Sequence, residues 1–117
     1  MDQLTIAVAN GDSGVQILRL TGPLTLNTLF EFQDLARSGS GQAIVVDLSG
    51  VPYMDSAGLG AMLGVLASCQ RQDRGFAVAG LSERIRTLSQ VTHVDGLIPV
   101  FSTAEDAERG LAKSAGA

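Results

Sequence analysis

The chain has 117 residues, 45% of them apolar and 17% charged, which fits one domain over residues 1–117 with its own hydrophobic core. Its net charge is −4, so we expect no general attraction to nucleic-acid phosphates or to anionic membranes. The single Cys69 cannot form an intrachain disulfide. Because His93 is the only histidine and is distant in sequence from this cysteine, we expect no metal site, and we also expect no cofactor. The N-terminus lacks the basic start of a secretory signal and no apolar run approaches ~20 residues, so we expect a cytoplasmic protein.

The first twenty residues predict a β-hairpin. Leu4, Ile6 and Val8 alternate with smaller residues, which is the period of a half-buried strand. A dense turn signal follows at 10–14, and residues 15–20 supply the return strand.

A helix is predicted between residues 26 and 35, where Leu and Phe recur at roughly helical spacing. Thr28 and Glu31 are placed as a capping box at its start, and the Ser-Gly-Ser-Gly run at 38–41 predicts its end. Residues 43–48 then form a continuous, largely β-branched run. Such a run is typical of a strand covered by helices on both faces of a mostly parallel sheet.

The second half of the chain alternates helices and strands. In order, the patterns predict a helix from Asp55 that ends before Gly75, a strand at 76–79, a helix capped by Ser82, an edge strand at 98–101 and a final helix with Ser102 and Glu105 as capping box. Cys69 lies on the apolar stripe of the first of these helices, so we expect it in the core. Ala107 and Leu111 of the last helix are expected to face the body. The order predicts a single α/β domain, with a mixed, mostly parallel sheet, an N-terminal hairpin and about four helices.

The junction after strand 43–48 is the segment best placed for function, because groups beyond the carboxyl ends of such strands are exposed and adaptable. Two interpretations stay open. In the structural one, Asp55 or Ser56 caps the next helix, while Gly58 and Gly60 let it pack closely. In the functional one, the Ser56 hydroxyl accepts a phosphate, because a helix N-terminus partly stabilises the added dianion.

Two stretches, Asp47-Leu48-Ser49-Gly50-Val51 and Met54-Asp55-Ser56-Ala57-Gly58-Leu59-Gly60, resemble the signature of the STAS domain family, particularly of bacterial anti-sigma factor antagonists. The resemblance extends along nearly the whole chain. It implies that an anti-sigma factor, itself a serine kinase of the GHKL type, binds the unmodified protein and phosphorylates Ser56. Phosphorylation then releases the partner, and a PP2C-type phosphatase restores the unmodified form. It also implies a regulator with no catalysis of its own.

The expected partner-binding positions surround this junction. They are Leu24, Thr25, Thr28, Asp55, Ser56, Ala57, Gly58, Leu59 and Met62. The sequence departs from the family at one place: many members have Gly-Glu-Leu-Asp before the first helix, where this chain has Gly22-Pro23-Leu24-Thr25. Because both acids are missing, we expect kinase recognition or phosphorylation efficiency to differ. Thr25 is expected to cap the helix or to contact the partner.

Three other functions have weaker support. A serine hydrolase needs Gly-x-Ser-x-Gly, whereas Met54 stands two residues before Ser56. A dinucleotide site needs a third glycine one place earlier than Gly64, although weak nucleotide binding stays open. A receiver-like domain needs an acidic pair after the first strand and a late lysine, but the first turn offers Asp12 alone and Lys113 lies in the terminal helix.

Within the STAS resemblance, a second function stays open. The chain is then a subunit of a larger assembly, such as a stressosome-like scaffold or a lipid-transporter accessory protein. Ser56 would act there through docking and not through control of a sigma factor.

Overall fold

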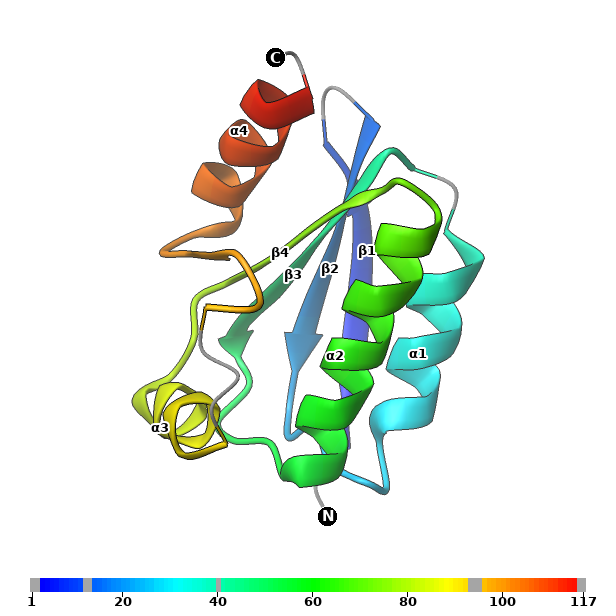
Figure 1. Cartoon of the computed structure of the whole chain (residues 1–117). Coiled ribbons are helices and arrows are strands. Elements are labelled where there is room, and N and C mark those ends of the chain that lie inside the picture. Colours follow the sequence, from blue (N-terminus) through cyan, green and yellow to red (C-terminus); the bar gives the residue numbers. More distant parts are fainter. Residues whose placement is uncertain (1–2, 12–13, 40, 93–95, 116–117) are drawn as a thin grey trace.

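The computed structural model describes residues 3–11, 14–39, 41–92 and 96–115, in which helices and strands alternate after an N-terminal hairpin (Figure 1). The elements are β1 (Thr5–Asn10), β2 (Val15–Thr21), α1 (Leu29–Ser38), β3 (Ala43–Gly50), α2 (Ser56–Arg71), β4 (Gly75–Ala79), α3 (Glu83–Val91), β5 (Val100–Phe101) and α4 (Ala104–Ala115). The order confirms the predicted α/β class, the hairpin and the four helices.

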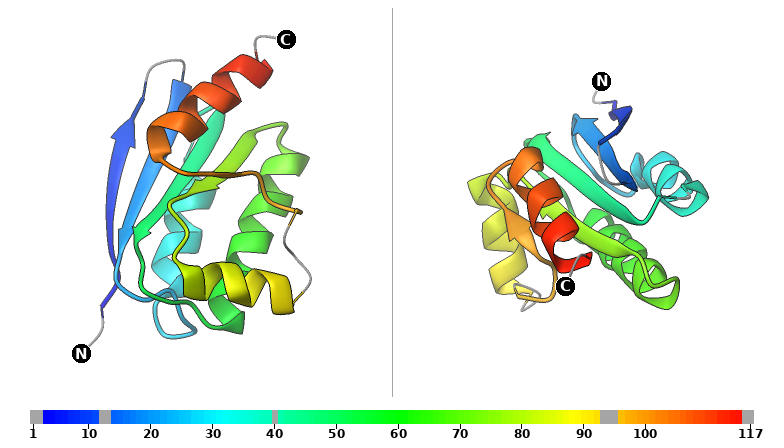
Figure 2. Two further views of the ribbon diagram at one scale, coloured as in Figure 1. Left: turned by 90° about the vertical axis from the view of Figure 1, so that its left-hand side faces the viewer. Right: turned by 90° about the horizontal axis from the view of Figure 1, so that it is seen from above.

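The strands form one five-stranded sheet in the order β1-β2-β3-β4-β5. β1 and β2 are antiparallel, and every later neighbour is parallel. β5 lies at the edge, as predicted from Pro99, but it is shorter than the predicted strand at 98–101 and begins just after that proline. Helices α1 and α2 cover one face and α4 covers the other, while α3 lies near the carboxyl ends of β3 and β4 (Figures 1 and 2). The start of α2 is at this same end of the sheet.

The two faces of β3 belong to two different hydrophobic clusters, which explains its continuous apolar sequence. Ile44 and Val46 are fully buried in the cluster that includes Phe32 of α1. Val45 is fully buried in the other cluster, with Ala107 of α4. The prediction that helices cover both faces of this strand is therefore confirmed.

Two of the predicted helix caps are wrong. Thr28 precedes α1, but its side chain makes no cap hydrogen bond to that helix. At the last helix, the cap is one residue later than predicted: the Thr103 hydroxyl accepts from the Asp106 amide at 3.1 Å. The Ser82 cap of α3 is confirmed, since its hydroxyl accepts from the backbone N–H of Ile85 at 3.3 Å.

The remaining core predictions concern Cys69, Ala107 and Leu111. Cys69 is buried, and its burial raises the pKa of the thiol, against a smaller opposing effect of Arg74. Ala107 is fully buried and Leu111 packs against the same cluster, so both face the body as predicted. His93 lies outside the described residues.

Candidate functional site

Ser56 is the first residue of α2 and its side chain is exposed. It follows the β3–α2 loop, so it stands beyond the carboxyl end of a buried central strand, where the sequence predicts it. The preceding Asp55 is the N-cap: its Oδ1 accepts from the backbone N–H of Gly58 at 2.8 Å. Because Asp55 performs the capping, the Ser56 hydroxyl is not needed for it.

The second oxygen of the Asp55 carboxylate binds a different part of the chain. Oδ2 accepts from the backbone N–H of Leu26 at 3.1 Å, in the loop between β2 and α1. One carboxylate therefore holds both the start of α2 and the loop before α1. Hydrogen bonds to a charged acceptor are stronger than neutral ones, so this side chain fixes the position of Ser56 firmly.

Backbone hydrogen bonds join the same two loops. The Leu24 N–H donates to the Tyr53 carbonyl at 3.2 Å, and the Asp55 N–H donates to the Leu24 carbonyl at 3.3 Å. Leu24 and Met54 form an isolated parallel bridge, which adds a short extension to the β2–β3 pairing. We call residues 24–26 and 53–55 the loop clamp.

Gly58 is required by this arrangement. A Cβ at Gly58 would lie 2.1 Å from the carbonyl oxygen of Leu24, which is far inside van der Waals contact. The prediction that Gly58 permits close approach is confirmed. The same prediction for Gly60 is wrong, because a Cβ there would meet nothing within 4 Å.

The missing acids before α1 are replaced by a hydroxyl-linked turn. The Thr28 hydroxyl accepts from the Thr25 N–H at 2.9 Å and donates to the Pro23 carbonyl at 2.9 Å. The Thr25 carbonyl in turn accepts from the N–H of Leu29 at 2.9 Å, in the first turn of the helix. Thr28 thus ties the turn together, which is why its side chain does not cap α1.

The predicted contact positions divide by exposure. Ser56 is exposed, and the partly exposed positions are Thr25, Thr28, Asp55 and Ala57. The buried ones are Leu24, Gly58, Leu59 and Met62. These four are enclosed by the chain's own core in the free protein, and partner contact at all nine positions stays a prediction.

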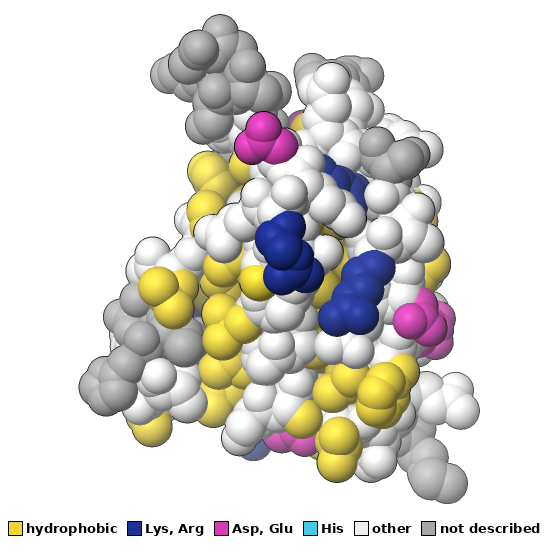
Figure 3. Space-filling model, turned by 45° about the vertical axis from the view of Figure 1, so that its right-hand side comes forward, with side chains coloured by type: hydrophobic (Ala, Val, Ile, Leu, Met, Phe, Trp, Pro, Cys, Tyr) yellow, Lys and Arg dark blue, Asp and Glu magenta, His cyan; other side chains and the backbone are white. Residues whose placement is uncertain are grey.

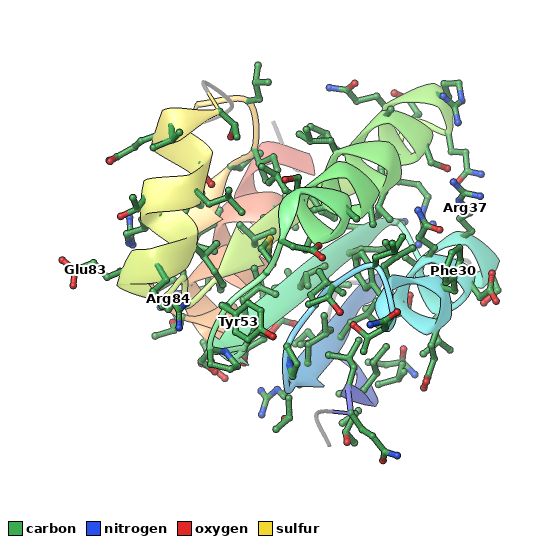
Figure 4. All side chains as sticks on the ribbon, turned by 90° about the horizontal axis from the view of Figure 1, so that it is seen from below. Phe30, Arg37, Tyr53, Glu83 and Arg84 are labelled. Carbon is green, nitrogen blue, oxygen red and sulfur yellow. The ribbon has the colours of Figure 1, made fainter. Side chains whose placement is uncertain are left out.

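Two exposed apolar residues were not among the predicted contacts: Leu26, within the loop clamp, and Phe30, in the first turn of α1. Leu26 and Phe30 are 59% and 62% exposed, respectively. Phe30 projects outward from α1 in Figure 4, and Figure 3 shows hydrophobic side chains gathered around the lower part of this face. The helical pattern contained the signal: the buried residues of α1 are Leu29, Phe32 and Ala36, and Phe30 lies off that stripe.

On the other side of Ser56, the β3–α2 loop contacts α3. The Arg84 guanidinium lies 5.3 Å from the centre of the Tyr53 ring, within the range of a cation–π interaction. The Ser82 hydroxyl also donates to the Pro52 carbonyl at 3.5 Å. Figure 4 shows Tyr53 and Arg84 on one side of the start of α2 and Phe30 on the other.

Two features are absent from the described ranges. No three His, Cys, Asp or Glu side chains there are grouped so as to hold a metal ion. No helix in that part of the chain is both long and apolar enough to cross a membrane.

The comparisons with known proteins agree with the fold. The family model described as the STAS domain matches residues 7–107. The anti-sigma-B factor antagonist of Staphylococcus aureus (strain NCTC 8325 / PS 47) is 31% identical over 91 residues, which cover 75% of this chain and 84% of that protein. The solved structure of an anti-sigma factor antagonist from Mycobacterium paratuberculosis superposes with a TM-score of 0.78 at 25% identity, covering 92% of this chain and 93% of that one.

A more distant likeness extends to a protein solved in a modified state. The Bacillus cell fate determinant SpoIIAA, in its phosphorylated form, superposes with a TM-score of 0.71 at 18% identity, covering 90% of this chain and 97% of that one. This likeness concerns the fold. Because the family model matches most of the sequence and the curated relative is similar over three quarters of it, the chain belongs to the STAS domain family.

Proposed function

We propose that this protein is an anti-sigma factor antagonist whose binding is controlled by phosphorylation of Ser56. In its unmodified form it binds an anti-sigma factor, a serine kinase of the GHKL type, and a PP2C-type phosphatase reverses the modification. The observation that carries the proposal is the exposed Ser56 hydroxyl at the first position of α2, left free because Asp55 caps the helix. The curated relatives, which are anti-sigma-B factor antagonists, support the partner class.

The electrostatics of the site favour a switch without refolding. Phosphate adds about −1.5 to −2 charges at pH 7. The helix N-terminus tolerates this charge inside the free protein. The loop clamp does not use the Ser56 hydroxyl, so its hydrogen bonds survive the modification. A partner that covers Ser56 beside the Asp55 carboxylate would meet the added charge directly, and binding would weaken.

The exposed apolar pair, Leu26 and Phe30, gives the partner a surface to bind. Burial of such side chains stabilises an interface, whereas exposed side chains of this kind add little to the stability of the free protein. The Leu26 N–H is bonded to Asp55, so this residue is held at the same junction as the modified serine. In this proposal Leu26 and Phe30 contribute affinity and Ser56 controls it.

The missing acids before α1 alter the environment of the phosphoacceptor. Thr25 stands where many family members have an acid, and its amide is bonded to Thr28. The carboxylate that remains at the junction is that of Asp55, and both of its oxygens are hydrogen-bonded. We therefore expect the cognate kinase to position the Ser56 hydroxyl mainly with its own residues.

The test compares variants of Ser56 for binding to the anti-sigma factor. Ser56→Ala should bind as the unmodified protein does, while Ser56→Asp and the phosphorylated protein should bind about a hundredfold more weakly, because about 3 kcal/mol of repulsion corresponds to that ratio. Isothermal titration calorimetry with the purified partner measures it. Ser38→Asp, which adds the same charge at the far end of α1, is the matched control and should bind normally.

Intact-mass analysis of protein isolated from its own cells should show the added phosphate, and Ser56→Ala should remove it. If the alanine and aspartate variants capture the same partners equally well from an extract, the switch is wrong. Recovery of a large assembly by both variants would favour the scaffold-subunit function instead.

A further inference from the structure

A cavity of about 100 Å³ lies between α2, α3 and the sheet. Its walls are mostly apolar. They are formed by residues at or just before α2 and α3, by β3 and β4, and by the segment at β5: Met54, Leu59, Met62, Leu81, Ile85, Leu48, Val78, Ile98 and Val100. In Figure 3 hydrophobic side chains run along the groove beside α2. The cavity is separate from the exposed surface at Leu26 and Phe30.

The size and chemistry of this cavity suit an apolar group better than water. One water needs only about 10–15 Å³ of such space, and it also needs polar partners. Here most of the lining is aliphatic. An engineered apolar cavity of about 150 Å³ stays dry and admits benzene, so about 100 Å³ suits a tail of roughly four to six carbons. Filling it would recover the dispersion contacts that the lining now lacks.

The rim supplies the polar end of the recognition. Arg86, Ser89 and Gln90 of α3 border the cavity, and Arg86 is the only charged residue among its described lining residues. A guanidinium binds a carboxylate through two parallel hydrogen bonds. The hydroxyl and the amide can add further hydrogen bonds to the same group.

We propose that this cavity is a binding site for a small carboxylic acid with a short alkyl tail. The tail enters between α2 and α3, and the carboxylate stays at the rim with Arg86. Binding is non-covalent and does not depend on Ser56 or on its modification.

The experiment titrates the full-length protein with sodium hexanoate and follows backbone amides by NMR. We expect saturable shifts at residues of the cavity wall, such as Leu59, Val78 and Ile85, with millimolar affinity. Hexanol should bind several times more weakly, and hexylammonium more weakly still, because Arg86 repels its charge. Shifts scattered over the surface, or no saturation with hexanoate, would overturn the proposal.

Two substitutions distinguish the site of the alkyl tail, inside the cavity, from the site of the carboxylate head, at Arg86 on the rim. Arg86→Gln should weaken hexanoate at least fivefold while leaving hexanol unchanged, and Arg84→Gln, whose guanidinium packs on Tyr53, is the matched control. Leu81→Trp, at a half-buried wall position, should block both ligands by filling the space. The circular dichroism spectrum and urea midpoint of each variant establish that it is folded. Equal hexanoate binding by folded Arg86→Gln and Arg84→Gln would contradict the proposed head site.

Discussion

The start of α2 is packed very differently on its two sides. Toward the loop before α1, the backbone approaches so closely that Gly58 has no room for a side chain, and hydrogen bonds join the two loops. Toward α3, the same segment borders a cavity of about 100 Å³ with largely aliphatic walls. Close packing on one side fixes the position of Ser56, while the other side has space for a ligand.

This contrast has a physical basis in the bonds that each side uses. Hydrogen bonds of the loop clamp have defined lengths and directions, so they hold two loops in one arrangement. Apolar contacts are non-directional, so we expect the walls of the cavity to tolerate more than one side-chain arrangement. The two sides should therefore respond unequally to matched substitutions.

The largest effect is expected from leucine-to-alanine changes on the two sides. Leu24 is a fully buried residue of the loop clamp, so Leu24→Ala should reduce the free energy of unfolding by about 3–4 kcal/mol. Leu81 is half-buried beside existing space, and Leu81→Ala should cost about 1 kcal/mol. Urea denaturation measures both. Equal losses would mean that the two sides are packed alike.

The next effect tests the close approach directly. Gly58→Ala should reduce the free energy of unfolding by about 2–3 kcal/mol, because the added methyl group meets the Leu24 carbonyl oxygen and forces the helix away from the loop. Thermal unfolding reports the loss, and the amide of Leu24 should shift in NMR spectra. A stability close to that of the unsubstituted protein would show that the loop moves aside freely.

A smaller effect is expected from the carboxylate that joins the two loops. Asp55→Ala removes the cap of α2 and the acceptor of the Leu26 N–H, and should cost about 1–2 kcal/mol. Asp34→Ala, at an exposed carboxylate of α1, is the control and should change stability by less than about 0.5 kcal/mol. Hydrogen exchange at Leu26 should accelerate in the first variant only. Unchanged exchange at Leu26 would contradict the loop clamp.

The sequence predicts the fold well because its signals are local. The apolar run at 43–48 comes directly from the burial of β3. The alternation at 4–8 predicts the strand β1, although Val8 is 47% exposed and its predicted half-buried face is only partly covered. The cap of α3 is equally local, since Ser82 needs only the nearby Ile85 amide. The exposed Ser56 was also predictable, because it follows a buried strand and starts a helix.

The rest of the site depends on contacts between distant segments. The residues around Thr28 do not predict that its hydroxyl donates to the Pro23 carbonyl and makes no cap hydrogen bond to α1. Leu24 and Met62 are both predicted contact residues from the sequence, yet both are buried in the free protein. The cavity exists because side chains from several elements do not fill the space between them. Such a gap cannot be predicted from the sequence of any one segment.

Gly58 and Gly60 illustrate the same difference, and they give the smallest and most discriminating prediction. Gly60→Ala should stabilise the protein by up to about 1 kcal/mol, because alanine has a higher helix propensity and its Cβ would meet nothing within 4 Å. Chemical denaturation of Gly60→Ala and Gly58→Ala should therefore give changes of opposite sign, although the two glycines lie on the same helix. A loss of stability in Gly60→Ala would contradict the open space around Gly60.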